Sequence, residues 1–312
     1  SQFTLNFITY IGIITSIFAA SVALLQDDIK KVIAYSTCSQ LGYMFFACGI
    51  SAYSLAMFHL VTHAFFKALL FLAAGSVIHS LHHEQNFKNM GELYKKLPIT
   101  YFFVIVGSLA LTGIPPFAGY FSKDLILEFA LSKHTFNSTN VYIFGCLGAF
   151  LTAIYSTRLL YFTFHGKSKI SPTIFKDIKE PPYVMIVPLF ILAIGAIFGG
   201  YIFYNLVYDN SFWKDSIFTL NNINYVEEAH HIHKIFKLIP IILVVTAFII
   251  VFGSYKFIQD LSASFQKTIS QIINTKLERG LEMLKKQGIF IKSISVVGGV
   301  ANNDYIKSRL EI

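Results

Sequence analysis

Long apolar runs dominate this sequence and restrict its fold more than any other feature. A helix needs about 20 apolar residues to cross the hydrocarbon core of a bilayer. Seven such runs lie at 5–25, 33–50, 54–79, 99–131, 141–164, 183–206 and 237–258. Only 13% of the residues are charged, against about 25% in soluble domains. The sequence therefore predicts an all-α polytopic membrane protein with about seven transmembrane segments.

The fourth run, 99–131, is too long for one simple span and carries helix-breaking residues. Its centre reads LTGIPPFAGYFSKD and contains Gly113, Pro115 and Pro116. Proline interrupts helical hydrogen bonding, and irregular backbone at membrane depth is tolerated only where protein or a wet cavity surrounds it. We therefore predict one broken helix, with two halves joined at these three residues.

Lysines are unequally distributed between the loops on the two sides of the predicted spans. Loops 26–32, 80–98 and 165–182 hold nine lysines, whereas loops 51–53, 132–140 and 207–236 hold three. Basic loops favour the cytoplasmic or matrix side of a membrane. The formal net charge of +8 is therefore better explained by basic loops than by a nucleic-acid partner.

Metal and disulfide chemistry has little support in the sequence. The three cysteines form no CxxC motif, so neither a disulfide framework nor a zinc or iron–sulfur site is indicated. The segment EEAHHIHK, residues 227–234, contains metal-ligand types, but its position in a loop favours a solvated juxtamembrane segment.

Three ionisable residues lie in the apolar segment HLVTHAFFKALLF. His59, His63 and Lys67 are spaced by four residues, so they share one face of a helix. They extend about 12 Å along the axis, a distance that suits a proton relay through His63 and water. Structural histidines packed between helices are one alternative. An HxxxH zinc site is another, which the absence of an adjacent carboxylate and third ligand disfavours.

Four further charged residues fall inside predicted spans, where charge is costly and often marks an ion path. These are Lys123, Asp124, Glu128 and Arg158. Lys123 follows the helix break, whose free carbonyls and space for water could stabilise an ammonium. We expect Asp124 and Glu128 to pair with Lys123 or with a neighbouring helix. The alternative is an interfacial lysine that extends towards water.

Long motifs in this chain resemble a known family. DDIKKVIAYSTCSQLGYM, HLVTHAFFKALLFLAAGSVIH, EQNFKNMGELYKKLP and LTGIPPFAGYFSKDLIL are similar to the largest antiporter-like subunit of respiratory complex I, which is subunit 5 in mitochondria and the L subunit in bacteria. The resemblance covers residues 1–258, as an antiporter-like transmembrane domain. Subunits of multisubunit cation/proton antiporters share part of the pattern, but HHEQN and GIPPFAGYFSKD favour complex I.

The resemblance implies a fold of inverted five-helix repeats, each with a broken helix, and a proton channel along the membrane plane. It assigns His59, His63 and Lys67 to the central hydrated relay and Lys123 to its end. Asp28, which the residues alone would place in an ordinary solvated loop, matches an acidic position near the relay. The implied function is proton translocation driven by quinone reduction elsewhere in NADH:quinone oxidoreductase, without a redox centre or cofactor in this chain.

The resemblance also implies where this protein works and with what. We expect a multi-pass protein of the bacterial inner membrane or the mitochondrial inner membrane, in contact with lipid and with other membrane-arm subunits of complex I. In the family a first repeat precedes the position of Ser1, so the chain is expected to begin inside a longer gene or to need a partner chain with that repeat.

The character of the sequence changes after about residue 258. Residues 259–287 are amphipathic and charged, and residues 289–310 read as a short strand, a glycine turn and a helix start. This soluble α/β-like tail, 259–312, resembles an internal stretch of the TsaD-type tRNA threonylcarbamoyladenosine enzymes, which have an actin-like ATPase fold. Gly298, Gly299 and Asn302 would form a vestigial nucleotide turn. Because that family's histidines and catalytic aspartate are missing, we predict a non-catalytic appendage and no nucleic-acid partner.

Other functions remain open at this point. Two resemblances in one chain suggest a chimera, and a non-functional chimeric or truncated product would form no stable assembly. A subunit of a cation/proton antiporter is a second alternative. A membrane-tethered tRNA-modifying module ranks last, because it would need the missing half of a nucleotide site.

Overall fold

The computed structural model describes residues 1–133, 136–205, 213, 216–217, 229 and 232–287. The regular secondary structure of the described residues is helical, apart from one isolated antiparallel bridge between Asp28 and Asn86. Loops and turns connect the helices. The chain separates into two compact units, Ser1–Val251 and Phe252–Ile312. The predicted all-α fold is therefore confirmed for the described residues.

Most of the predicted spans correspond to long apolar helices. Five described segments are long and apolar enough to cross a membrane: Gln2–Leu25 (α1), Tyr53–Ser80 (α3), Asn137–His165, Tyr183–Ile202 (α8) and Lys234–Tyr255. Helix α2, Ile29–Gly49, and helix α4, Pro98–Thr112, cover parts of the other two predicted spans. The count of seven crossings stays a prediction.

The fourth apolar run is interrupted near its middle. Helix α4 ends at Thr112, and Gly113 caps it in the left-handed conformation with φ of +81°. The chain then passes through Pro115 and Pro116 before a π-helical turn, η3 (Tyr120–Asp124), leads into α5 (Leu125–Ser132). The run therefore forms two half-helices, with the left-handed glycine and the two prolines between them.

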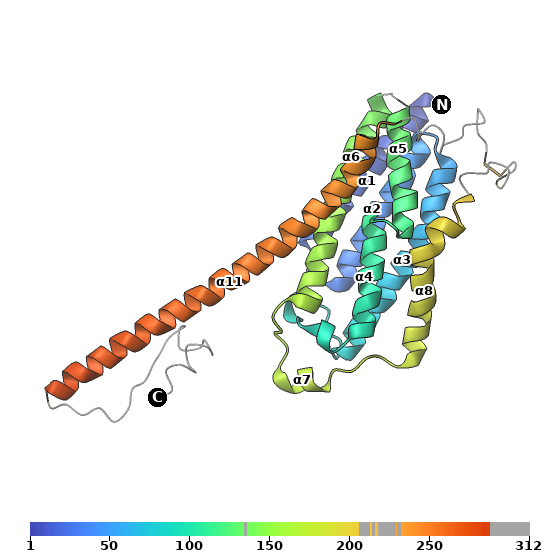
Figure 1. Ribbon diagram of the computed structural model, residues 1–312. Coiled ribbons are helices and arrows are strands. Elements are labelled where there is room, and N and C mark those ends of the chain that lie inside the picture. The colour runs from blue at the N-terminus through green and yellow to red at the C-terminus, as the bar shows by residue number, and fades with distance from the viewer. Residues whose placement is uncertain (134–135, 206–212, 214–215, 218–228, 230–231, 288–312) are drawn as a thin grey trace. The chain divides into compact units, whose positions relative to one another are not determined.

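The long helices α6 and α8 continue the bundle after the break, with the short helix α7 between them. Helix α6, Phe136–Leu160, ends in a second π-helical turn, η4 (Tyr161–His165), and the short helix α7 spans Pro172–Asp177. Helix α8 follows at Tyr183–Ile202 and packs against α3 and α4. In Figure 1, α6 and α8 run beside α1, α2 and α3, so the first unit is a bundle, and α7 lies at one end of it.

The last described element, α11, is one helix from Lys234 to Lys286. It passes through the predicted boundary at residue 258 without a break (Figure 1). The described part of the tail up to Gln287 is thus helical. The predicted strand and turn, with Gly298, Gly299 and Asn302, lie outside the described residues, so the nucleotide turn stays a prediction.

The three lysine-rich loops meet at one end of the bundle. The Ile29 amide donates to the Gln85 carbonyl at 3.0 Å, and the Glu92 amide donates to the Gly166 carbonyl at 2.9 Å. The Glu180 carboxylate accepts from the amide of Ile99 at 2.6 Å, at the start of α4. These contacts join loops 26–28, 81–97 and 166–182, which places them on the same side, as the span pattern predicts.

Close backbone contact joins the first two helices. A Cβ added at Gly42 of α2 would lie 2.7 Å from the Gly12 carbonyl oxygen and 2.6 Å from the Ser16 amide nitrogen, both on α1. Small residues allow membrane helices to approach this closely. Helix α2 also packs against α3, so α1 supports the helix that faces the ionisable row of α3.

Candidate proton-transfer site

The ionisable row of helix α3 is buried inside the bundle. The exposed fractions are 0% for His59, 5% for His63 and 4% for Lys67. Helix α3 packs against α2, α4 and α8, and it also contacts the π-helical turn η3. The spacing of four residues thus turns all three polar side chains away from the outer surface and towards neighbouring helices.

Lys67 belongs to a hydrogen-bonded group between three helices. Its Nζ donates to Ser36 Oγ at 2.6 Å and lies 3.4 Å from the Ile33 carbonyl oxygen, both on α2. Ser36 Oγ lies 2.6 Å from the hydroxyl of Tyr155 on α6. A cavity of about 10 Å³ borders these side chains, which is close to the space that one water requires. The ammonium therefore has oxygen partners from both the backbone and side chains.

His59 belongs to a second group that reaches the broken helix. Its Nδ1 lies 2.9 Å from Ser122 Oγ on η3, and its Nε2 lies 3.2 Å from Gln40 Oε1 on α2. Thr62 Oγ1 donates to the same Ser122 oxygen at 2.7 Å. A neutral ring that carries its proton on Nε2 and accepts at Nδ1 satisfies both contacts of the imidazole. The ring is thus oriented by two neighbouring elements.

His63 lies between these two groups. Its ring centroid is 5.9 Å from that of His59 and 5.3 Å from that of Phe66. Its Nε2 is buried and has no hydrogen-bond partner within the described part of the chain. Proton transfer between Lys67 and His59 would therefore need water beside His63, because protein hydrogen bonds do not bridge it there.

The π-helical turn η3 places two charged neighbours in different surroundings. Lys123 is fully buried, and its Nζ lies 4.9 Å from the ring centroid of Tyr43 with no hydrogen-bond partner among the described residues. Asp124 is 4% exposed, and its Oδ2 also lacks such a partner. The ion pairs of the described residues do not join Lys123 to Asp124. Instead, Glu128 Oε2 lies 3.3 Å from Lys237 Nζ of helix α11.

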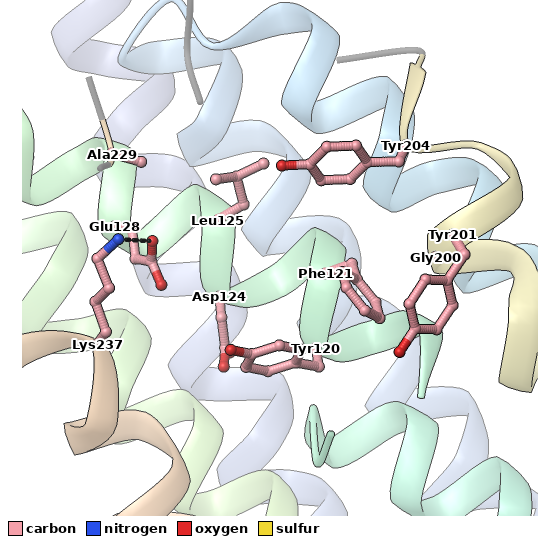
Figure 2. A pocket seen from close by; sticks show the side chains of 10 residues that line it. All are labelled: Tyr120, Phe121, Asp124, Leu125, Glu128, Gly200, Tyr201, Tyr204, Ala229 and Lys237. Carbon is pink, nitrogen blue, oxygen red and sulfur yellow. Dashed lines mark ion pairs between the residues drawn. The ribbon is translucent and has the colours of Figure 1, made fainter. Parts of the chain in front are cut away.

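A cavity of about 420 Å³ lies on the outer side of this turn. Figure 2 shows Asp124 and Glu128 on one face of the broken helix, with Lys237 beside Glu128 in an ion pair and with Tyr120, Tyr201 and Tyr204 also lining the cavity. Its lining consists of Tyr120, Phe121, Asp124, Leu125, Glu128, Gly200, Tyr201, Tyr204, Ala229 and Lys237. Lys123 does not line this cavity, so the two neighbours of η3 face different spaces.

Two predicted charged residues have structural roles at the ends of helices. Asp28 is the N-cap of α2 and accepts hydrogen bonds from the amides of Lys30 and Lys31. Arg158 donates to the carbonyls of Leu24 and Gln26 at the end of α1 and forms an ion pair with Asp27. The structure therefore places Arg158 outside the buried row and Asp28 at the end of the bundle where the lysine-rich loops meet.

Several residues of the site carry no charge and were missed from the sequence. Ser36 and Gln40 contact members of the buried row and Tyr43 contacts Lys123, and the three residues are spaced by four and then three positions on α2. This spacing places them on one helical face. A search for uncharged polar residues with helical spacing inside apolar runs would have found them.

Metal binding finds no support among the described residues, where no group of three histidine, cysteine, aspartate or glutamate side chains is close enough to hold an ion. The HxxxH pair therefore lacks further ligands there, and His59 contacts Ser122 and Gln40 instead. Most of the EEAHHIHK segment lies outside the described residues, so its solvated character stays a prediction.

Two family models match this sequence. Residues 1–152 match the transmembrane family described as NADH:quinone oxidoreductase/Mrp antiporter, and residues 155–217 match the C-terminus of NADH dehydrogenase subunit 5. Among solved structures, the chain is similar to one from an archaeal respiratory complex, the membrane-bound sulfane sulfur reductase. The identity is 33% and the TM-score 0.56, over 62% of this chain and 32% of that one.

A chain of the Mrp complex from a Dietzia species shares the fold, with a TM-score of 0.62 at 22% identity over 87% of this chain and 30% of that one. NADH-quinone oxidoreductase subunit L of Rickettsia bellii is 50% identical over 85% of this chain and 40% of its own length. NADH-ubiquinone oxidoreductase chain 5 of Phytophthora infestans is 46% identical, again over 85% of this chain, and 41% of its length is covered. The chain thus spans about two fifths of these relatives. Residues 1–152 and 155–217 are thus similar to the antiporter-like membrane subunits that the two family models describe.

Proposed function

We propose that this chain forms the second half-channel of a proton-translocating membrane subunit of complex I. The observation that supports this most is the buried row itself. Lys67, His63 and His59 follow one face of α3, and Ser122 connects His59 to the turn that carries Lys123. Uncompensated polar groups are costly inside a membrane, which favours a role in charge movement over packing.

The route that we propose has two hydrogen-bonded parts and one hydrated joint. A proton would pass from the Lys67 group to His63 through water, then to His59 and on to Lys123. The Asp124 and Glu128 carboxylates border the outer cavity, which suits the end of the route. Asp28, at the N-cap of α2, would act on the electrostatics of the loop end from outside the buried row.

The proposed setting is the inner membrane of a bacterium or mitochondrion, with other membrane-arm subunits of complex I as partners. A chain with the first repeat would be among them. We propose that quinone reduction elsewhere in the complex supplies the energy and that this chain binds no flavin, iron–sulfur cluster or nicotinamide. Residues 259–312 would be a non-catalytic appendage, which keeps their resemblance to TsaD-type enzymes as a prediction.

A cation/proton antiporter subunit is the second candidate function. It is favoured by the likeness in fold to a chain of the Mrp complex. The match of residues 155–217 to the subunit 5 C-terminus favours complex I instead. Cofractionation of the chain with NADH dehydrogenase activity in native gels would separate the two candidates, because an antiporter subunit would migrate apart from that activity.

Lys67→Ala tests the proton route in membrane vesicles that contain the assembled complex. We expect the number of protons pumped per NADH oxidised to fall, while NADH oxidation in uncoupled vesicles is largely retained. Lys176→Ala is the control, because Lys176 is an exposed lysine on helix α7. An unchanged proton-to-electron ratio for Lys67→Ala, with normal assembly, would contradict the proposed role.

A further inference from the structure

Lys123, the last lysine of the proposed proton route, has an unusual partner. Lys123 is fully buried, yet its Nζ has no hydrogen-bond acceptor among the described residues. Its neighbour Asp124 does not form an ion pair with it. The ammonium instead lies over the face of the Tyr43 ring, with its Nζ 4.9 Å from the ring centroid. This distance lies within the range of about 6 Å in which a ring attracts a cation.

Tyr43 is held firmly in the position that this contact requires. It is fully buried, and its hydroxyl donates to the Gly145 carbonyl of α6. Its ring packs against Phe46 with centroids 4.8 Å apart. A Cβ added at Gly148 would lie 2.7 Å from the Tyr43 hydroxyl oxygen, so the glycine leaves room for that oxygen. The ring is therefore anchored at its edge while its face is turned to Lys123.

An aromatic face differs from an oxygen ligand in one respect that matters for proton transfer. The ring quadrupole attracts an ammonium, but the ring offers no lone pair that could take its proton. A carboxylate would bind the ammonium through a strong charge-assisted hydrogen bond and compete for that proton. Lys67, by contrast, donates to the oxygen of Ser36 at 2.6 Å. Lys67 is therefore held by a hydrogen bond to an oxygen, whereas Lys123 is held by an aromatic face.

We propose that Tyr43 is a positioning residue for Lys123, which holds the ammonium by its ring face and leaves the protons of the ammonium free for water. This inference rests on the proposed proton route and adds to it a residue from outside the charged row. The aromatic face is the required property, whereas the hydroxyl anchors the ring to α6. Phenylalanine at position 43 should therefore retain most of the proton pumping, whereas an aliphatic side chain should not.

The test compares Tyr43→Phe with Tyr43→Leu in vesicles that contain the assembled complex. We expect Tyr43→Phe to pump at close to the unmodified rate. Tyr43→Leu should lower proton pumping about five- to thirtyfold at an equal rate of NADH oxidation, the range that loss of one buried cation–π contact predicts. Phe103→Leu is the matched control, because Phe103 is a buried aromatic residue of helix α4 whose ring packs against Phe102. It should lower pumping much less.

A fluorinated phenylalanine series at position 43 separates the electrostatic role from simple packing. Successive fluorines weaken the negative face of the ring with little change in its size, so pumping should fall stepwise from Phe to its trifluorinated form. This comparison also covers the case in which Tyr43→Leu fails to assemble. Pumping that is insensitive to fluorination would overturn the proposal, because the ring would then only fill space.

Lys123→Ala distinguishes failure of this proposal from failure of the proposed function. Abolished pumping in Lys123→Ala, with normal pumping throughout the series at position 43, would overturn the role of Tyr43 alone. Normal pumping in Lys123→Ala would overturn both, because the lysine that Tyr43 positions would then have no part in the route.

Discussion

Lys237 Nζ at the start of helix α11 lies 3.3 Å from Glu128 Oε2 on the second half of the broken helix. The same turn of α11 accepts a hydrogen bond at the Phe236 carbonyl from the Tyr142 hydroxyl of α6, at 2.8 Å. Glu128 follows Asp124 by four residues, so both carboxylates face the 420 Å³ cavity. An ion pair to Glu128 and a hydrogen bond from Tyr142 thus hold the beginning of α11 against the second half of the broken helix and α6.

Removing the lysine of this ion pair should destabilise the bundle. Both side chains are mostly buried, with exposed fractions of 24% for Lys237 and 16% for Glu128. Lys237→Ala would leave the carboxylate poorly solvated, which costs about 1–3 kcal/mol. We expect a lower Tm for the detergent-solubilised protein, and the double variant Lys237→Ala/Glu128→Gln should recover part of the loss. Strictly additive losses would mean that the pair contributes no coupling energy.

Ser36→Ala should affect both the stability of the bundle and pumping, because Ser36 Oγ contacts Lys67 and Tyr155 at 2.6 Å each. The substitution would leave two buried polar groups short of a partner, at about 1–3 kcal/mol. Ser76→Ala is the matched control, since the hydroxyl of this buried serine donates to the Leu72 carbonyl of its own helix. Thermal unfolding and proton pumping measured on both variants check the prediction. Equal effects in the two variants would contradict it.

Gly42→Ala should separate helices α1 and α2. The added methyl group would lie 2.6–2.8 Å from backbone atoms of Gly12 and Ser16, which cannot move without the whole helix. Overpacking of this kind costs about 1–3 kcal/mol. The control is Gly75→Ala, where an added Cβ would meet no atom within 4 Å. The yield of folded protein from membranes and its Tm should both fall for Gly42→Ala only. Alanine favours helix more than glycine does, so a similar fall in both variants would contradict the role of this helix contact.

The acid stability of the loop end should depend on Asp27. Burial by itself would raise the pKa of this carboxyl, but hydrogen bonds and charges from Lys88 and Arg158 lower the pKa below its ordinary value of 3.8. Because the folded-state pKa is the lower one, the stabilisation is complete above the ordinary value and is lost as pH falls through the lowered pKa.

Asp27→Asn tests this dependence through Tm measured as a function of pH. The stability advantage of the unmodified protein over Asp27→Asn should be constant above about pH 5 and shrink below about pH 4. Asp27 is 34% exposed, so the effect should also weaken with added salt. An advantage that stays constant down to pH 2 would contradict the assigned pairing.

The helical bundle and the face of the buried row could be predicted from sequence because both depend on local pattern. A spacing of four residues fixes a common face for His59, His63 and Lys67 whatever surrounds the helix. The break at Gly113 follows in the same way, because glycine and proline act on the backbone at their own positions.

The partners of these residues could not be predicted in this way, because they depend on how separate helices are rotated against one another. Nothing within the α3 segment indicates that Ser36 would meet Lys67, or that Tyr43 would face Lys123. The expected pairing of Glu128 illustrates this, since two partners were open and the structure gives Lys237 of α11.

The domain boundary expected near residue 258 stays a prediction, and a continuous helix passes through that position. Hydropathy changes there, but residues 254–279 contain neither glycine nor proline, the two residues least favourable in a helix. Helix α11 therefore continues to Lys286. A change of surroundings along a chain does not require a change of backbone structure, so a limit drawn from polarity alone does not locate the end of a helix.

The π-helical turn η3 has a consequence for electrical insulation. Lys123 lies against Tyr43 inside the bundle, whereas Asp124, the next residue, lines the outer cavity. The enclosed interior and the cavity are thus lined by successive residues of one turn. Insulation between the two spaces at this point therefore depends on how tightly side chains pack around a single peptide unit.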